Sequence, residues 1–181
     1  ECIDFLKGNV AKDLETVSLA LAAHMIRLGG RAKSMQQASK MAYEAVSKGA
    51  ASDKFKQIIQ AQGGDARVVD NPDLLPRTPF VDELRSPRTG FVTRCDAKLL
   101  GLASNALGAG RDRVDDVVHP AVGLYLERKA GDAVKRGDTL CRIHWNDEKR
   151  LQSAKALIEK AFEVRARPVP QRPLIHATLE G

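Results

Sequence analysis

The chain has 181 residues, of which 43% are hydrophobic and 29% are charged, close to the average for globular proteins. This composition argues against an intrinsically disordered, collagen-like or low-complexity chain. Lys and Arg exceed Asp and Glu by 29 to 23, and aromatic residues make up only 4%. Because nucleic-acid binders usually concentrate positive charge on one face and add stacking aromatics, we expect no nucleic-acid partner.

The cysteines and the hydropathy pattern indicate in which cellular compartment the protein is expected. Cys2, Cys95 and Cys141 are odd in number, lie far apart and form no CxxC motif. They therefore predict reduced thiols in a reducing compartment, which points to the cytoplasm. The four histidines do not cluster with them, so no zinc site is expected. No run of 18 apolar residues occurs, and we expect neither a membrane span nor a signal peptide.

The first residues carry information about the origin of the chain. The sequence begins with Glu1 rather than Met, and Glu1 leads directly into a helical pattern that ends at Gly8. A natural N-terminus seldom begins inside an element of secondary structure. We therefore expect the chain to be the downstream fragment of a longer protein.

The first sixty residues predict four helices, most of which end at glycine. The second is amphipathic, because apolar residues recur at steps of three and four and predict a buried face: Leu14, Val17, Leu21, Met25 and Leu28. Ser34 is expected to cap the third helix, which ends near Gly49, and Ser52 is expected to cap the fourth. In the fourth helix the residues expected to face inward are Phe55, Ile58 and Ile59.

Prolines between residues 70 and 79 interrupt the helical pattern and mark a connection. The elements expected after it are strands at 80–84, 90–93, 121–129 and 139–145, a turn at 86–89, and helices at 98–107 and 147–161. Within residues 129–144, alternating apolar residues around two Gly-Asp turns predict a β-hairpin with Val134, Leu140 and Ile143 directed inward. The tail, residues 165–181, contains three prolines and is expected to be extended.

No catalytic constellation stands out in this sequence. The segment 108–113 has glycines after a helix and two arginines, so it could hold a phosphate, although it lacks the spacing of known phosphate loops. The alternative is a helix-ending turn with exposed arginines. His119 is a candidate acid–base group, or alternatively a structural residue. Arg111 and His119 are thus the candidate substrate-binding residues, whereas Cys95 and Cys141 are expected to be small apolar residues rather than nucleophiles.

The segment 129–144 resembles the hammerhead strands of biotinyl and lipoyl carrier domains. Those carriers display a modified lysine at a hairpin tip. No lysine in that setting follows here, because the next element is Asn146-Asp147 and a helix. A stand-alone hammerhead carrier, or an interaction domain, is therefore the alternative function.

Several short motifs follow one another along nearly the whole chain. They are Phe5-Leu6-Lys7-Gly8, Ala61-Gln62-Gly63-Gly64-Asp65, Leu75-Pro76, Pro87-Arg88-Thr89-Gly90-Phe91-Val92, Leu107-Gly108-Ala109-Gly110-Arg111, Pro120-Ala121-Val122-Gly123, and the stretch from Gly131-Asp132 to Ile143-His144. In this order they resemble the C-terminal portion of the thymidine phosphorylase and pyrimidine-nucleoside phosphorylase family.

The resemblance implies an α/β fold that becomes α+β at the C-terminus. Residues 1–75 would be a helical part of the large α/β domain, and residues 76–181 a small α/β hammerhead domain with an extended tail. The full-length parent would be a pentosyltransferase of pyrimidine salvage that converts thymidine and inorganic phosphate to thymine and 2-deoxyribose 1-phosphate. It would be a cytoplasmic homodimer, formed through a domain missing here, with no organic cofactor and no membrane.

The resemblance also implies where the catalytic and ligand-binding residues lie. The family's Gly-rich phosphate loop with its lysine, and the Arg, Ser and Lys that hold the base, lie upstream of the part that this chain resembles. We therefore expect no catalytic residue in these 181 residues, and no activity from them alone. Some family members bind a monovalent cation through backbone carbonyls and a Glu carboxylate. The resemblance places Glu1 at that Glu, which implies potassium in the full-length enzyme; the alternative is a solvated glutamate.

Overall fold

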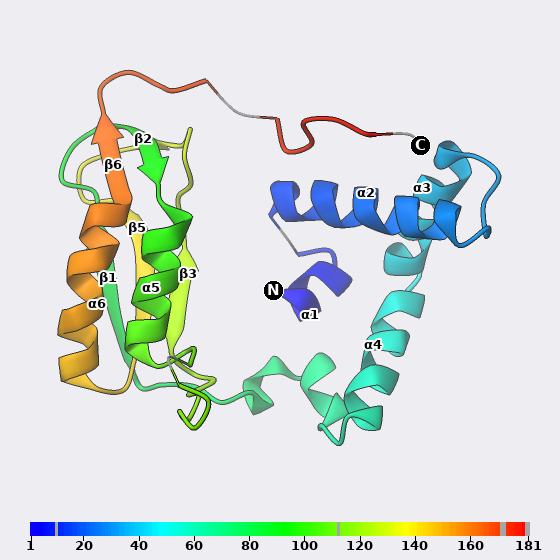
Figure 1. Cartoon of the computed structure of the whole chain (residues 1–181), viewed down its shortest axis with the longest axis horizontal. Helices are drawn as coiled ribbons and strands as arrows, with labels where there is room; N and C mark the ends of the chain where they lie inside the picture. Colours follow the sequence, from blue (N-terminus) through cyan, green and yellow to red (C-terminus); the bar gives the residue numbers. More distant parts are fainter. Residues whose placement is uncertain (10, 112, 171–172, 180–181) are drawn as a thin grey trace. The chain divides into compact units, whose positions relative to one another are not determined.

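The structure, a computed structural model, describes residues 1–9, 11–111, 113–170 and 173–179. They form two compact units: an N-terminal unit of residues 1–74 with residues 173–179, and a C-terminal unit of residues 75–170 (Figure 1). The division falls beside the expected boundary between residues 75 and 76. Residues 165–170 of the predicted tail belong to the C-terminal unit, whereas residues 173–179 group with the N-terminal unit. Asp112 of the segment 108–113, and residues 171–172 and 180–181 of the predicted tail, lie outside the described residues.

Helices make up the N-terminal unit. They are α1 (Cys2–Leu6), α2 (Lys12–Leu28), α3 (Met35–Ser47) and α4 (Ala50–Ala61), followed by the 3-10 helices η1 (Ala66–Val69) and η2 (Pro72–Leu74). Ser34 caps α3 as predicted, because its Oγ accepts a hydrogen bond of 3.2 Å from the Gln37 backbone N–H. The prediction that Ser52 caps α4 is wrong. Gly49, at a left-handed φ of +84°, reverses the chain directly after α3, so α4 begins at Ala50.

The N-terminal unit buries little apolar surface. Its core cluster consists of Ala23, Ala32 and Ala38, with Ile26 partly buried against it. The prediction of which residues face inward is therefore partly wrong. Four of these residues are exposed, namely Leu21, Met25, Leu28 and Ile58, whereas Phe55 and Ile59 are half-buried. The reason is that α2 turns its alanine side toward α3, since small side chains let two helices approach closely. None of the described helices has the length and apolar character needed to cross a membrane.

The C-terminal unit combines two helices with two antiparallel sheets of three strands each (Figure 1). Its elements are β1 (Phe80–Arg85), β2 (Gly90–Cys95), α5 (Ala97–Leu107), β3 (Gly123–Leu126), β4 (Ala133–Val134), β5 (Thr139–Trp145), α6 (Glu148–Ala161) and β6 (Phe162–Arg165). One sheet has the order β1-β5-β3 and the other β4-β2-β6. Helices α5 and α6 are confirmed where the sequence predicts them, each capped by an aspartate, Asp96 and Asp147.

The predicted hairpin within residues 129–144 is wrong, although both of its turns form. Gly131 and Gly137 adopt left-handed φ angles of +103° and +91°, but β4 pairs with β2, whereas β5 pairs with β1 and β3. The chain passes from one sheet to the other because the turn after β4 is bonded to the turn after β1. The Gly137 N–H donates a hydrogen bond of 2.8 Å to the Ser86 carbonyl oxygen. The Ser86 N–H donates a hydrogen bond of the same length to the Asp138 carbonyl oxygen. The sequence analysis also missed β6, which follows α6 directly.

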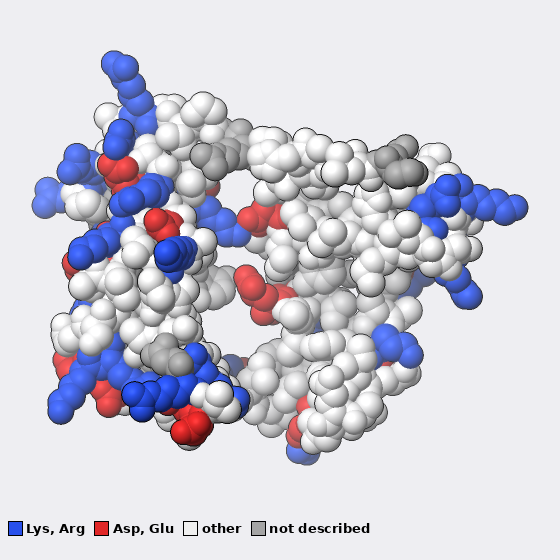
Figure 2. Space-filling model, viewed as in Figure 1, with Lys and Arg blue, Asp and Glu red and all other residues white. Residues whose placement is uncertain are grey.

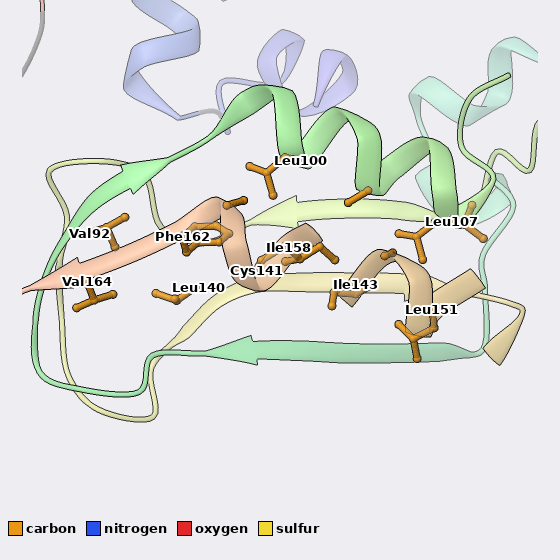
Figure 3. Packing of buried hydrophobic residues seen from close by; sticks show 14 of the residues in the cluster. Val92, Leu100, Leu107, Leu140, Cys141, Ile143, Leu151, Ile158, Phe162 and Val164 are labelled. Carbon is orange, nitrogen blue, oxygen red and sulfur yellow. The ribbon is translucent and has the colours of Figure 1, made fainter. Parts of the chain in front are cut away.

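Both sheets and both helices contribute to one core (Figure 3). Val134, Leu140 and Ile143 are buried in it as predicted. Helix α6 contributes one continuous apolar face, and its buried residues are Leu151, Ala154, Ile158 and Ala161. Since α5 supplies Leu100, Ala103 and Leu107 in the same way, the two helices fix the position of the loop between α5 and β3.

An ion pair joins β1 to α6, with 2.6 Å between Lys155 Nζ and Asp82 Oδ2. The hydrogen bond from Lys155 lowers the pKa of Asp82 below its usual value of 3.8. Because the pKa is lower in the folded state, the pair stabilises the fold above the unfolded-state pKa and loses this effect as pH falls through the folded-state pKa. Both side chains are more than one third exposed, so solvent screening reduces the effect.

We expect Lys155→Met to lower the free energy of unfolding by less than about 1 kcal/mol at pH 7. The difference from the unsubstituted chain should shrink as pH is lowered from about 4. Urea unfolding at several pH values measures both effects. Lys160→Met is the control, because Lys160 lies on the same helix and forms no ion pair with the described residues. A cost for Lys155→Met that does not change with pH would show that packing, rather than charge, accounts for it.

Candidate functional site

A polar pocket of about 580 Å³ lies where the end of α5, the loop after it and the first turn of α6 meet. Its polar lining residues are Asn105, Arg113, Asp115, Asp116, His119 and Arg150. All of them belong to the C-terminal unit, so the pocket depends on the packing of α5 against α6.

Gly108 allows the loop after α5 to close at its base. It ends α5 at a φ of +98°, and its carbonyl accepts a hydrogen bond of 2.9 Å from the His119 backbone N–H. A Cβ at Gly108 would lie 2.3 Å from Arg150 Nη1 and 3.1 Å from His119 Cδ2. The guanidinium and the imidazole therefore lie against the last turn of α5, where the helix dipole favours a cation.

Two further contacts shape the loop. A Cβ at Gly110 would lie 1.8 Å from Asn105 Oδ1, so the Asn105 amide packs directly on the Gly110 backbone. The Arg113 backbone N–H donates to Asp116 Oδ2 at 2.8 Å, which makes a turn at the outer part of the loop. The loop and the first turn of α6 thus bring two arginines, a histidine and two aspartates to one pocket, a set suited to binding a polar ligand by charge and hydrogen bonds.

The structure brings together only some of the residues that the sequence singled out. His119 lines the pocket, whereas Arg111 is exposed on the same loop and does not line it. Sequence reasoning missed Arg150 and Asn105. Arg150 comes from the first turn of α6, and only the packing of two helices brings it to His119, so no local signal could have found it. That Arg111 and His119 bind substrate stays a prediction.

Glu1 lies in the N-terminal unit as the N-cap of α1. Its ammonium group is 3.3 Å from Asp4 Oδ2, and its backbone carbonyl accepts a hydrogen bond from the Phe5 N–H. Within the described ranges, no group of three or more His, Cys, Asp or Glu side chains could hold a metal ion. The predicted site at Glu1 would instead use backbone carbonyls and a single carboxylate, and the potassium assignment stays a prediction.

Burial argues against Cys95 and Cys141 as nucleophiles. Cys141 is fully buried in the core, and burial raises the pKa of its thiol to about 12. Burial also raises the pKa of Cys95. Because the thiolate is the reactive form, both side chains are unreactive near neutral pH, and Cys141 packs as the small apolar residue that was predicted.

The comparison with known proteins agrees with this fold. Residues 91–165 match the model of the pyrimidine nucleoside phosphorylase C-terminal domain. Over 176 residues, 97% of this chain, the sequence is 38% identical to the pyrimidine-nucleoside phosphorylase of Geobacillus stearothermophilus. The chain belongs to the pyrimidine-nucleoside phosphorylase family. It corresponds to a C-terminal portion, since it spans only 40% of that relative.

A second phosphorylase relative gives the same result. The pyrimidine-nucleoside phosphorylase of Staphylococcus aureus (strain USA300) is 40% identical over 146 residues, which are 81% of this chain and 34% of that protein. The match to the phosphorylase C-terminal domain extends from β2 to β6 and includes the loop that forms the pocket. It confirms the resemblance to the phosphorylases and favours this family over the carrier domains as the interpretation of the β-rich segment.

Proposed function

We propose that the full-length protein containing this chain is a pentosyltransferase that phosphorolyses pyrimidine nucleosides, thymidine among them. A phosphate oxygen forms a bond to C1′ of the sugar while the bond from C1′ to the base nitrogen breaks. The base leaves with the electron pair and is protonated, which gives thymine and 2-deoxyribose 1-phosphate. The observation that supports this proposal is the 38% identity to a pyrimidine-nucleoside phosphorylase over 97% of the chain.

The proposal assigns the chemistry to the part of the enzyme that precedes this chain. The pocket described above is lined by no Ser, Thr, Cys or Lys side chain. We propose that the C-terminal unit supports that upstream part. Arg111 and His119 are the residues predicted to contact phosphate or nucleoside. The proposal also includes a cytoplasmic homodimer formed through a part outside this chain. The three free cysteines suit a reducing compartment.

The test compares the full-length protein with the 181-residue chain. We expect the full-length protein to release thymine from thymidine only when phosphate is present, as measured by chromatography of the free base. The 181-residue chain alone should release no thymine above a blank, because the resemblance places the residues that hold phosphate upstream. A full-length protein that converts no pyrimidine nucleoside would reject the proposed function. Activity in the isolated chain would show that it contains the catalytic residues.

The predicted potassium ion has its own test in the full-length protein. A monovalent cation needs oxygen ligands, and a carboxylate adds negative charge that backbone carbonyls lack. Replacing the residue at the position of Glu1 by Gln keeps the size and one oxygen but removes the charge. We expect the melting temperature and activity to depend less on potassium, with folding otherwise intact. Asp4→Asn, a neighbouring acid on α1, is the control. An unchanged potassium dependence would identify Glu1 as an ordinary surface acid.

A further inference from the structure

Helix α2 has an apolar stripe whose C-terminal part the described residues of the N-terminal unit leave exposed. The stripe consists of Leu14, Val17, Leu21, Met25 and Leu28, which lie on one face because they are three or four residues apart. Leu21, Met25 and Leu28 are 61%, 73% and 86% exposed. Large apolar side chains scattered singly are ordinary on protein surfaces, but three consecutive members of one helical stripe are not.

The composition of the middle of α2 is unusual for a helix with a solvated stripe. No Lys, Arg, Asp or Glu occurs between Glu15 and Arg27, which is three turns of helix. Figure 2 accordingly shows the middle of α2 without charged side chains on the face that it displays. A helix with a solvated face normally carries charged residues on that face, and the exposed part of this stripe lacks them.

The small core of the N-terminal unit also indicates that α2 has a partner surface outside this unit. Its buried cluster is made of three alanines, Ala23, Ala32 and Ala38, and Ala42 and Val69 are also buried, whereas Leu21, Met25 and Leu28 of α2 are exposed. Apolar burial is the main force that stabilises a fold, and alanines contribute little of it. The unit therefore needs an apolar partner surface to be completed.

We propose that the apolar stripe of α2 is the docking surface for the part of the phosphorylase that precedes this chain. This inference rests on the proposed function insofar as that function assumes a longer enzyme. The chain aligns over 97% of its own length with a relative of which it spans only 40%, so three fifths of that relative have no counterpart here. A segment of the same polypeptide is present at a high effective concentration and covers the stripe in every molecule.

The test measures access to the stripe with cysteine substitutions in a Cys2→Ser background. Met25→Cys places a thiol on the stripe, and Thr16→Cys places one on the opposite side of α2, where Thr16 is also exposed. Each variant is prepared as the 181-residue chain and as the full-length protein and treated with a maleimide. Mass spectrometry of the α2 peptide then gives the labelling rate at each position.

We expect the thiol at position 25 to react roughly tenfold or more slowly in the full-length protein than in the 181-residue chain, because labelling then requires local opening. The thiol at position 16 should react at similar rates in both. Equal rates at position 25 would overturn the proposal. So would protection of position 25 in the 181-residue chain that increases with concentration, because a second copy would then cover the stripe. An inactive full-length protein with position 25 protected would reject the proposed function and keep this interface.

Discussion

Val134→Asp is expected to unfold the C-terminal unit at temperatures where the unsubstituted chain is folded. Val134 lies in β4, is 3% exposed and belongs to the core that both sheets share. A carboxylate there would have no partner and would either stay charged in an apolar surrounding or take up a proton. We expect a loss of about 3–5 kcal/mol in the free energy of unfolding, as measured by urea unfolding followed by circular dichroism.

The matched control is the residue before it. Ala133 is exposed, and its side chain points to the opposite face of the same short strand. Ala133→Asp introduces the same group one position away and should change the free energy of unfolding by less than about 0.5 kcal/mol. If the two variants unfolded at the same urea concentration, the assignment of Val134 to the core would be wrong.

Gly90→Ala is expected to weaken the contact between β2 and β6. A Cβ at Gly90 would lie 2.3 Å from the Arg165 carbonyl oxygen and 2.9 Å from its carbon. Both atoms belong to the backbone of the neighbouring strand, so no side-chain rotation can relieve the clash, and the strands must move apart. We expect a loss of about 1–3 kcal/mol, which thermal unfolding detects as a lower melting temperature.

Gly101 supplies the contrasting case for the same substitution. It lies within α5 with no atom near the position of a Cβ. Because alanine favours the helix over glycine, Gly101→Ala should raise stability by up to about 1 kcal/mol. An increase in stability for Gly90→Ala as well would contradict the close approach of β6 to β2.

Elements with local signals were predicted well from the sequence. Helix α5 ends at Gly108, as the glycines after its apolar stretch predict, and α6 begins and ends close to its predicted bounds, with its apolar spacing matching its buried face. The turns at Gly131 and Gly137 were predicted for the same reason. Strand pairing was not, because it joins residues distant in sequence. Alternation along residues 133–145 shows which side chains face inward but not which sheet each strand joins.

The spacing on α2 predicted a buried face, but three of its five residues, Leu21, Met25 and Leu28, are exposed. Periodicity identifies a face that needs burial, and it contains no information on whether the partner surface lies in the same stretch of sequence. The candidate site was found only in part for a similar reason. His119 stood out because it lies beside Pro120 in the loop after α5, whereas Arg150 looks like any exposed arginine near the start of a helix. Only the packing of α6 against α5 brings it to the pocket.

The pairing of β2 with β6 has a consequence for how the protein is made. Val92 lies opposite Val164, and Phe91 opposite Arg165, so partners about 70 residues apart in sequence form one ladder. During synthesis the chain emerges from the ribosome with its N-terminal end first. Strand β2 therefore waits, with one edge unpaired, until residue 165 has been translated. The helices of the N-terminal unit, whose contacts are mostly local, can form well before then. The C-terminal unit is thus expected to complete its folding only after β6 has left the ribosome, and to fold slowly because its contacts are distant in sequence.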